Sequence, residues 1–471
     1  MHPSTLSVDA YQLTTLVTHA DGGRLAQQVR MAFFFRRMPR ARNFVVFAGL
    51  ARVLEHAARM GFSPEEMVRL DEHPTLGLAL AKRPDLRRAL ASLEGFRGEI
   101  DAVPEGTLAF AGPARTVEGS PLTVGGAPLT VYTPLLQIRT DMLRAKLVET
   151  PWLGFINHMS MVASKAARVV LAARGRTVME FGQRRTHPLA ALDATYAAYL
   201  AGATATSNMA AYAAWGIPAY GTMDHFAVQA SEEDGVPREV TEERFFRDHQ
   251  RSFGAPVTFL VDTYDTERGI RNAVRAAGGG PFSVRIDSNV SRETIAGARA
   301  LLAELGASHG KIFVSDGLDE HKVRDLADLV DGFGVGENIS CSPDAAAGVG
   351  AVAKLVVNGY GKITMKLAKG SGKATLPGRL QVHRAPDHDL LALHDEAGPP
   401  GTHPLLLPVW RDGAPVEPLP SLEASRAHVA RQIASLPASL SALEVSPEPR
   451  PLVVSARLEQ LVRSLAGEAG A

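Results

Sequence analysis

The stretch from Gly216 to His225 brings together residue types that can do chemistry. It reads Gly-Ile-Pro-Ala-Tyr-Gly-Thr-Met-Asp-His. Ile217–Tyr220 is a short, mostly apolar run after a glycine, which predicts a strand. Thr222 then supplies a hydroxyl, and His225 supplies an imidazole that can titrate or act as a nucleophile near neutral pH. A single histidine at a strand end more often has a structural role, so the function of His225 depends on its neighbours.

Similar polar strand ends recur from Val178 to Glu337, where strand-like apolar runs alternate with helical patterns. The run ends are Glu180–Gly182, Thr206–Asn208, Thr222–His225, Asp262–Asp265, Arg285–Ser288, Ser315–Asp319 and Phe333–Glu337. This alternation indicates parallel strands with helical crossovers, and an α/β barrel places its active site at the carboxyl ends of its strands. The pattern therefore favours an irregular, TIM-like α/β barrel. A doubly wound open sheet also alternates and stays the second interpretation.

Two charged residues on one of these strands are expected to point the same way. Arg285 and Asp287 are two positions apart, so both would face the mouth of the barrel. They form either a plain ion pair or a site in which the arginine fork binds a planar carboxylate ligand. Asp319, before Glu320, is predicted to cap the following helix.

Other motif residues have both a chemical and a structural interpretation. Gly334 and Gly336 in Phe-Gly-Val-Gly can cradle a phosphate with backbone N–H groups, although this pattern alone is a weak signal. Phe181 and Tyr11 can stack on a flat heterocycle or simply pack in the core. A basic stretch faces either a polyphosphate or solvent, and comprises Lys366, Lys369, Lys373, Arg379 and Arg384.

The chain is predicted to have three parts. Short apolar runs broken by Gly and Pro, from Glu99 to Tyr132, indicate antiparallel strands. Thr133–Lys146 and Gly154–Arg174 have helical spacing. We therefore expect an α+β domain at 1–150, a barrel domain carrying the active site at 151–385, and a connection with helices at 386–471 that packs on the first two.

Composition excludes some classes of partner. The 471 residues include 50 basic and 50 acidic side chains, so there is no electrostatic case for nucleic acid or an anionic membrane. Cys341 is the one cysteine, which excludes an internal disulfide and favours the cytoplasm. No window is apolar enough to span a bilayer, and Met1–Asp9 does not have the pattern of a leader.

The ordered set of motifs resembles the nicotinate phosphoribosyltransferase family over nearly the whole chain. The matching stretches are Asp9–Thr15, Phe34–Arg37, Val46–Leu50, Glu180–Arg185, Thr206–Asn208, Gly221–His225, Val284–Ser288, Lys311–Glu320, Phe333–Gly336, Lys373–Gly378, Pro404–Val409 and Gln432–Leu443. No single motif is decisive, but their joint order is specific.

The resemblance implies transfer of phosphoribose from phosphoribosyl pyrophosphate to nicotinate, with ATP hydrolysis and Mg²⁺, in pyridine nucleotide salvage. It also implies a homodimer whose active sites lie at the subunit interface. By position, His225 resembles the phosphorylated histidine and Asp287 a residue near the ribose and magnesium, while Gly334, Gly336 and Glu337 fall at the phosphate site. The residues that resemble substrate contacts are Tyr11 (from the partner copy), Phe181, Arg184, Ser207, Asn208, Thr222 and Arg285.

Two positions depart from the family pattern. The family continues Asp-Ser as Gly-Asp, whereas this chain has Asn289-Val290. At the position of the threonine that holds the 5-phosphate stands Glu337, whose repulsion of a phosphate dianion costs about one to several kcal/mol. Two alternatives therefore stay open. One is a paralogue with another aromatic acid or an altered ribosyl donor, and the other is a catalytically silent, ligand-binding homologue.

Overall fold

The computed structural model describes residues 4–341, 344, 348–367 and 373–467. By its internal contacts the chain divides into unit 1, Met1–Met161 with Ala347–Ala471, and unit 2, Val162–Ala346. These boundaries differ from the predicted ones at 150 and 385. The reason is that β16 (Ala351–Val357) pairs antiparallel with β1 (Gln28–Phe35), which joins the chain after 347 to unit 1.

Unit 2 contains a parallel sheet of six strands within the described residues, in the order β11-β10-β15-β14-β13-β12. The strands are β10 (Thr177–Glu180), β11 (Ala205–Thr206), β12 (Val257–Leu260), β13 (Phe282–Ile286), β14 (Lys311–Val314) and β15 (Gly332–Val335). The first strand lies between the second and the last, which is the circular order of a barrel. The protein is thus mixed α/β, as predicted, with half of a parallel barrel.

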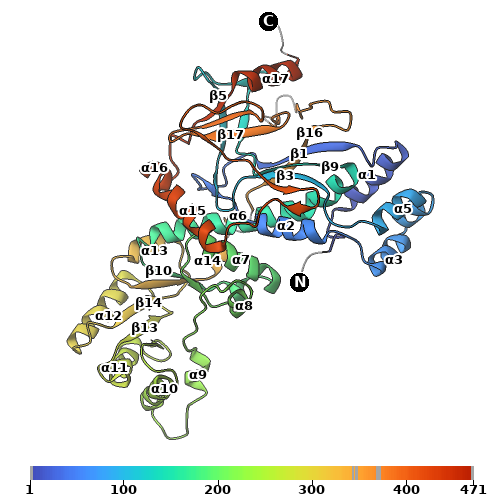
Figure 1. Cartoon of the computed structure of the whole chain (residues 1–471). Helices are drawn as coiled ribbons and strands as arrows, with labels where there is room; N and C mark the ends of the chain where they lie inside the picture. The colour runs from blue at the N-terminus through green and yellow to red at the C-terminus, as the bar shows by residue number, and fades with distance from the viewer. Residues whose placement is uncertain (1–3, 342–343, 345–347, 368–372, 468–471) are drawn as a thin grey trace. The chain divides into compact units, whose positions relative to one another are not determined.

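Helices connect these strands and cover one face of the sheet (Figure 1). They are α7 (Pro188–Leu200), α8 (Met209–Trp215), α9 (His225–Gln229), α10 (Arg238–Phe253), α11 (Thr266–Ala277), α12 (Arg292–Glu304), α13 (Glu320–Leu326) and α14 (Glu337–Ser340). The side chains of Val284, Ile312 and Phe333 on this face are fully buried. Asp319 accepts hydrogen bonds from the first backbone N–H groups of α13, which confirms its predicted capping role.

The strand expected at Ile217–Tyr220 was wrong. Ala219 makes an isolated parallel bridge to Thr206, supported by hydrogen bonds from the Thr206 N–H to the Pro218 carbonyl and from the Tyr220 N–H to the Thr206 carbonyl. Pro218 has no N–H to donate, so a longer ladder cannot form there.

Unit 1 is built around two sheets. One is antiparallel, in the order β16-β1-β9-β3-β20-β21, with β3 (Gly98–Ala102), β9 (Leu136–Asp141), β20 (Leu407–Arg411) and β21 (Ala414–Pro415). The helix predicted at Thr133–Lys146 was therefore wrong in its first part. Pairing of β9 with both β1 and β3 overrides the local helical spacing, and the helix α6 begins at Met142 and ends at Ala172.

The other sheet mixes parallel and antiparallel pairs in the order β19-β17-β18-β22-β5-β8. Its strands are β5 (Ala111–Thr116), β8 (Thr130–Tyr132), β17 (Leu380–Arg384), β18 (Asp389–Leu393), β19 (His403–Pro404) and β22 (Leu452–Val454). Two short pairs, β2 (Val45–Val46) with β4 (Leu108–Ala109) and β6 (Thr123–Val124) with β7 (Ala127–Pro128), complete the strands of the described part.

The remaining helices of unit 1 are amphipathic or short. They are α1 (Ala10–Asp21), α2 (Leu50–Arg59), α3 (Pro64–Glu72), α4 (Leu76–Ala81), α5 (Pro84–Ala91), α15 (Leu422–Ala434), α16 (Ala438–Ser441) and α17 (Ala456–Ala466). Within the described ranges, no helix is long and apolar enough to cross a membrane.

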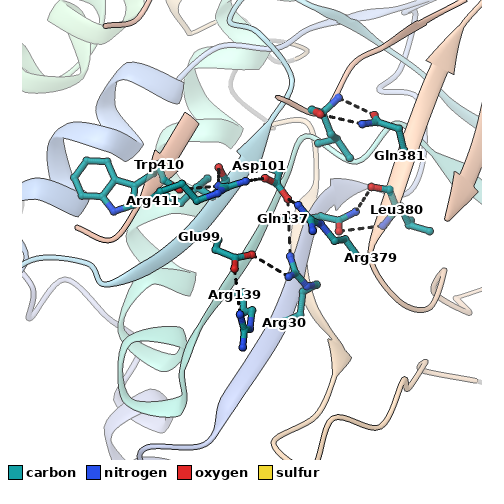
Figure 2. A network of polar contacts seen from close by, with 12 residues as sticks. Arg30, Glu99, Asp101, Gln137, Arg139, Arg379, Leu380, Gln381, Trp410 and Arg411 are labelled. Atoms are coloured by element: carbon teal, nitrogen blue, oxygen red, sulfur yellow. Dashed lines mark hydrogen bonds and ion pairs between the residues drawn. The ribbon is translucent and has the colours of Figure 1, made fainter. Parts of the chain in front are cut away.

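A polar network ties the first sheet of unit 1 together, and Figure 2 shows its arginines converging on Asp101. The Asp101 carboxylate is buried and is bound by Arg411 and by Arg379, whose Nη2 lies 2.7 Å away. Arg30 binds Glu99 at 3.1 Å and lies 3.9 Å from Asp101. Burial alone would raise the pKa of Asp101, but the hydrogen bonds and charges of Arg411 and Arg379 outweigh it and hold this pKa below its usual value.

Two members of the predicted basic stretch are thus used inside unit 1. Arg379 binds Asp101, and Arg384 binds the fully buried Asp389 at 2.7 Å. Lys369 lies outside the described residues. Arg379 and Arg384 thus form ion pairs with buried carboxylates, which neither interpretation of the basic stretch had included.

Substitution Asp101→Asn should lower the free energy of unfolding by about 3 kcal/mol at pH 7, because it leaves arginines without their buried counter-charge. Urea unfolding measures this difference. Since the folded pKa is depressed, the stabilisation is present above the unfolded value of about 4 and is lost as the pH falls through the folded value. Asp21→Asn, which breaks the exposed pair with Arg83, is the matched control and should change little. An equal loss in both variants would contradict this account of the network.

Candidate active site

A polar cavity of about 520 Å³ lies at the carboxyl ends of the parallel strands of unit 2. The predicted site residues that line it are Phe181, Arg184, Ser207, Thr222, Arg285, Asp287, Gly334, Gly336 and Glu337. Asn208 and His225 are adjacent in sequence to lining residues but are not part of the wall. The sequence pattern thus brings most of its candidates to one place in this unit.

The buried carboxylate of Glu180, at the end of β10, organises this edge of the sheet. It accepts hydrogen bonds from the hydroxyls of Thr195 at 2.9 Å and Thr206 at 2.8 Å, and from the Gly182 backbone N–H. The Ser340 hydroxyl adds a fourth bond at 3.3 Å. Because a buried carboxylate is tolerated only when it is well hydrogen-bonded, Glu180 fixes the ends of β10 and β11 and the turn after β10.

Asn208 belongs to this frame rather than to the cavity wall. Its Nδ2 donates to Thr195 at 3.2 Å, and its Oδ1 accepts from the Ala210 N–H to cap α8. The side chain is 1% exposed. Its neighbour Ser207 faces the cavity, so the motif supplies one wall residue and one structural residue.

Arg285 is held from one side by the loop that follows Gly221. Its Nη1 donates to the Thr222 hydroxyl at 2.8 Å and its Nη2 to the Met223 carbonyl at 3.1 Å. Its Nε is buried and has no hydrogen-bond partner among the described residues. Burial lowers the pKa of Arg285, and the charges of Asp287 and Asp262 oppose this. The guanidinium is therefore oriented at the cavity wall, and one of its buried donors lacks a partner among the described residues.

Asp287 sits beside a second carboxylate, Asp262. Asp262 Oδ2 accepts from the Asp287 N–H at 2.9 Å and from the Ser288 hydroxyl at 2.6 Å, whereas its buried Oδ1 has no partner among the described residues. Burial raises the pKa of Asp287, against the effects of a hydrogen bond from Ser315 and the charge of Arg285. This part of the site is built to concentrate negative charge, and that favours a positive partner.

His225 is the first residue of α9, and its ring is held by the loop after β12. Its Nδ1 lies 3.1 Å from the Thr263 hydroxyl. If Nδ1 carries the proton and the hydroxyl accepts it, Nε2 has the free lone pair of a nucleophile. The charge of a protonated His225 acts to lower the pKa of Asp287.

Positions 334 and 336 must be glycine because Phe181 lies close to the backbone at both. A Cβ at Gly334 would overlap the Phe181 ring, and one at Gly336 would come within 3.0 Å of the Phe181 carbonyl oxygen. The two glycines thus let the aromatic ring lie against β15. Glu337 follows them as an exposed residue in the cavity wall.

Tyr11 belongs to unit 1, on α1. Its ring is half-exposed, and the Lys146 ammonium lies over it at 5.2 Å from the centroid. An accessible aromatic face of this kind can stack on a flat ligand.

Sequence reasoning did not select three residues that the structure makes important, namely Glu180, Asp262 and Thr263. All three were recognised only as parts of polar strand ends, Glu180 also as part of a motif. On β13, the two-residue spacing of Arg285 and Asp287 predicted that both side chains point the same way. The contacts of Asp262 and Thr263 with residues of other strands could not be predicted, because they depend on the order of the strands in the sheet, which one sequence does not give.

The residues present fit a magnesium ion that arrives with a ligand rather than a preformed metal centre. No group of three or more His, Cys, Asp or Glu side chains in the described chain is placed to hold a metal. Magnesium commonly uses one or two carboxylates and completes its shell with water and substrate phosphates. Asp287 lines the cavity and offers one such carboxylate. Asp262 does not line it, but its buried Oδ1 has no hydrogen-bond partner among the described residues and is the second candidate.

Comparison with known proteins agrees with this geometry. The profile of the nicotinate phosphoribosyltransferase (NAPRTase) N-terminal domain matches residues 6–157, and that of the C-terminal domain matches residues 394–462. A nicotinate phosphoribosyltransferase of Mycobacterium tuberculosis is 34% identical over 472 residues, which cover 97% of this chain and 93% of that protein. The chain belongs to the nicotinate phosphoribosyltransferase family.

Other nicotinate phosphoribosyltransferases support the assignment. That of Bacillus subtilis is 30% identical over 83% of this chain and 76% of its own length. The crystal structure of the human nicotinic acid phosphoribosyltransferase superposes with a TM-score of 0.79 at 26% identity and covers 97% of this chain and 99% of that one. The likeness therefore extends over the full nicotinate phosphoribosyltransferase chain and is not confined to one motif.

Substitution Asp287→Asn should stabilise the free protein at pH 7. The folded pKa is raised, so the ionised carboxyl opposes folding at neutral pH, and a neutral amide removes that cost. The gain should stay below about 1 kcal/mol, because water reaching the half-buried carboxyl screens the charge. It should vanish below about pH 4, where the carboxyl is protonated in the unfolded chain as well. Thermal unfolding at several pH values measures it.

The matched control is Asp234→Asn, since Asp234 is exposed and outside the cavity. It should leave the melting temperature unchanged. Destabilisation by Asp287→Asn at pH 7 would contradict the electrostatic description of this carboxyl.

Proposed function

We propose that this chain forms nicotinate mononucleotide from nicotinate and phosphoribosyl pyrophosphate, with hydrolysis of ATP. The observation that carries the proposal is the oriented Arg285 beside Phe181 in a polar cavity, in a chain of this family. The arginine fork suits the carboxylate of nicotinate, and the aromatic ring suits its pyridine face.

In the proposed transfer, the pyridine nitrogen attacks C1 of the ribose. A C–N bond forms, the C1–oxygen bond breaks, and pyrophosphate leaves with the bonding electrons. Positive charge grows on the ribose in the transition state, and a nearby carboxylate stabilises such charge. We assign this role to Asp287, because its carboxylate lines the cavity on the same strand end as Arg285.

Magnesium bound to the donor pyrophosphate would neutralise charge on the leaving group. Asp287 and Asp262 are the residues that we propose to hold it. For this chain, the consequence is that both carboxylates are needed in the ionised form.

His225 is the proposed site of phosphorylation by ATP. Its Nε2 attacks the γ-phosphorus, the bond from phosphorus to the β,γ-bridging oxygen breaks, and ADP leaves. In this proposal the Thr263 hydroxyl accepts the proton of Nδ1, which leaves Nε2 free. Hydrolysis of the phosphohistidine would then return the enzyme to its starting state.

We also propose that the half-barrel belongs to an irregular TIM-like barrel, since its strand order is circular. A homodimer with shared sites would allow Tyr11 of the partner subunit to stack on the pyridine ring. Location in the cytoplasm stays a prediction from the single cysteine.

Glu337 supports a second candidate within the same chemistry, an altered ribosyl donor or another aromatic acid. It lines the cavity with an exposed carboxylate, where a 5-phosphate would be repelled. The silent, ligand-binding homologue is the third candidate, and it would bind nicotinate without turning over ATP.

The purified protein should form nicotinate mononucleotide when it is given nicotinate, phosphoribosyl pyrophosphate, ATP and Mg²⁺. Chromatography measures the product. Glu337→Thr should lower the KM for the donor by about tenfold, because it removes a repulsive charge. Glu337→Gln is the matched variant that removes the charge without adding the hydroxyl. His225→Ala should abolish the stimulation by ATP.

Different outcomes separate the candidates. Turnover only in Glu337→Thr would mean that the native donor differs. Nicotinate binding without turnover in any variant would support the silent homologue. Stimulation by ATP that survives in His225→Ala would refute the role of that histidine.

A further inference from the structure

A second cavity of about 550 Å³ runs along the inner face of the parallel sheet. It shares wall residues with the first cavity, so the two lie side by side. The shared residues are Phe181, Tyr220, Gly221, Thr222, Arg285, Ser315 and Gly334. A ligand held by Arg285 therefore has open space on more than one side.

This second cavity extends through the full depth of the sheet. Its wall includes Thr177, Val257, Phe282 and Lys311, which are the first residues of β10, β12, β13 and β14. The first cavity lies at the opposite, carboxyl ends of the same strands. The space thus runs from the candidate active site toward the amino ends.

The space exists because small side chains occupy inward positions of the sheet. Thr177, Thr258, Ser283 and Gly334 line it. In an α/β barrel, bulky branched side chains normally fill these layers. The opposite face carries bulky, fully buried residues such as Ile312. The cavity wall also includes the bulkier strand residues Met179 and Phe313, so the small residues open only part of this face.

The wall chemistry differs from that of the first cavity. Asp and Glu are absent from the described residues that line the second cavity, whereas Asp224, Asp287, Asp316 and Glu337 line the first. Aromatic pairs stand at its far end, with ring centroids 5.6 Å apart for Phe282 and His309 and 4.7 Å apart for His249 and Phe253. Such a wall favours a flat or apolar group over a metal.

We infer that the acceptor site is longer than one pyridine ring, and that this chain binds aromatic acids carrying an apolar extension. The carboxylate lies on Arg285 and the extension lies in the second cavity. The inference rests on the proposed function for the position of the carboxylate, and it adds a substrate class to that function.

The test compares nicotinate with pyridine-3-carboxylates that carry a phenyl or benzyl group, using calorimetric binding to the full chain. The extended acids should bind at least as tightly as nicotinate. Thr258→Phe and Ser283→Leu, which fill the second cavity from two different strands, should weaken the extended acids by tenfold or more and change nicotinate by less than twofold. Thr258→Val keeps the volume of the side chain and is the matched control.

Extended acids that do not bind the wild type, or that bind it and both filled variants equally, would overturn the inference. An equal loss of nicotinate and extended acids in both correctly folded variants, with Thr258→Val unaffected, would also overturn it. Formation of nicotinate mononucleotide is measured on the same samples, so failure of the proposed function would appear as absent turnover in the wild type and not as a difference among ligands.

Discussion

The candidate site depends on the hydrogen bonds and charges that stabilise the partly buried guanidinium of Arg285. Arg285 has lost much of its water, and burial lowers its pKa, so the charged form depends on the groups around it. Thr222 and the Met223 carbonyl satisfy two nitrogens, while Asp287 and Asp262 supply negative charge nearby. The buried N–H at Nε lacks a partner among the described residues, and the guanidinium lines the cavity, where a ligand carboxylate can bind it. Binding of an acid would then supply the guanidinium of Arg285 with an acceptor that the free protein does not provide.

This arrangement works only if the strand ends are fixed relative to one another. Glu180 provides that rigidity on one side of the sheet, since its four hydrogen bonds join β10, β11, α7 and α14. Asp262 provides it on the other side by binding the backbone of Asp287 and the hydroxyl of Ser288. Glu180 is buried and Asp262 is half-buried. Both hold donors from other elements, and loss of either would move residues in the cavity wall.

Much of this site could be predicted from the sequence because it follows local rules. The two-residue spacing of Arg285 and Asp287 predicted that both side chains point to the same face of the sheet. The position of Asp319 before Glu320 predicted a helix cap. The predictions that failed share one cause, which is pairing between strands far apart in the sequence. Local spacing could not reveal that Leu136–Asp141 would be sandwiched between β1 and β3, or that residues after 347 would join unit 1 through β16. Asn208 looked like a site residue because it follows a strand, and only the contacts of Thr195 and Ala210 explain its structural role.

The most direct test of this account is the binding preference for nicotinate over its neutral amide, nicotinamide, in the wild type and in Arg285→Gln. Calorimetry should give a preference of about 10- to 100-fold for the acid in the wild type, as expected for hydrogen bonds to a charged group. The preference should disappear in Arg285→Gln. Because both ligands are measured on the same variant, a change in folding or cavity shape affects them alike and leaves the ratio informative. Equal binding of both ligands by the wild type, or an undiminished preference in Arg285→Gln, would contradict the claim that Arg285 recognises the carboxylate.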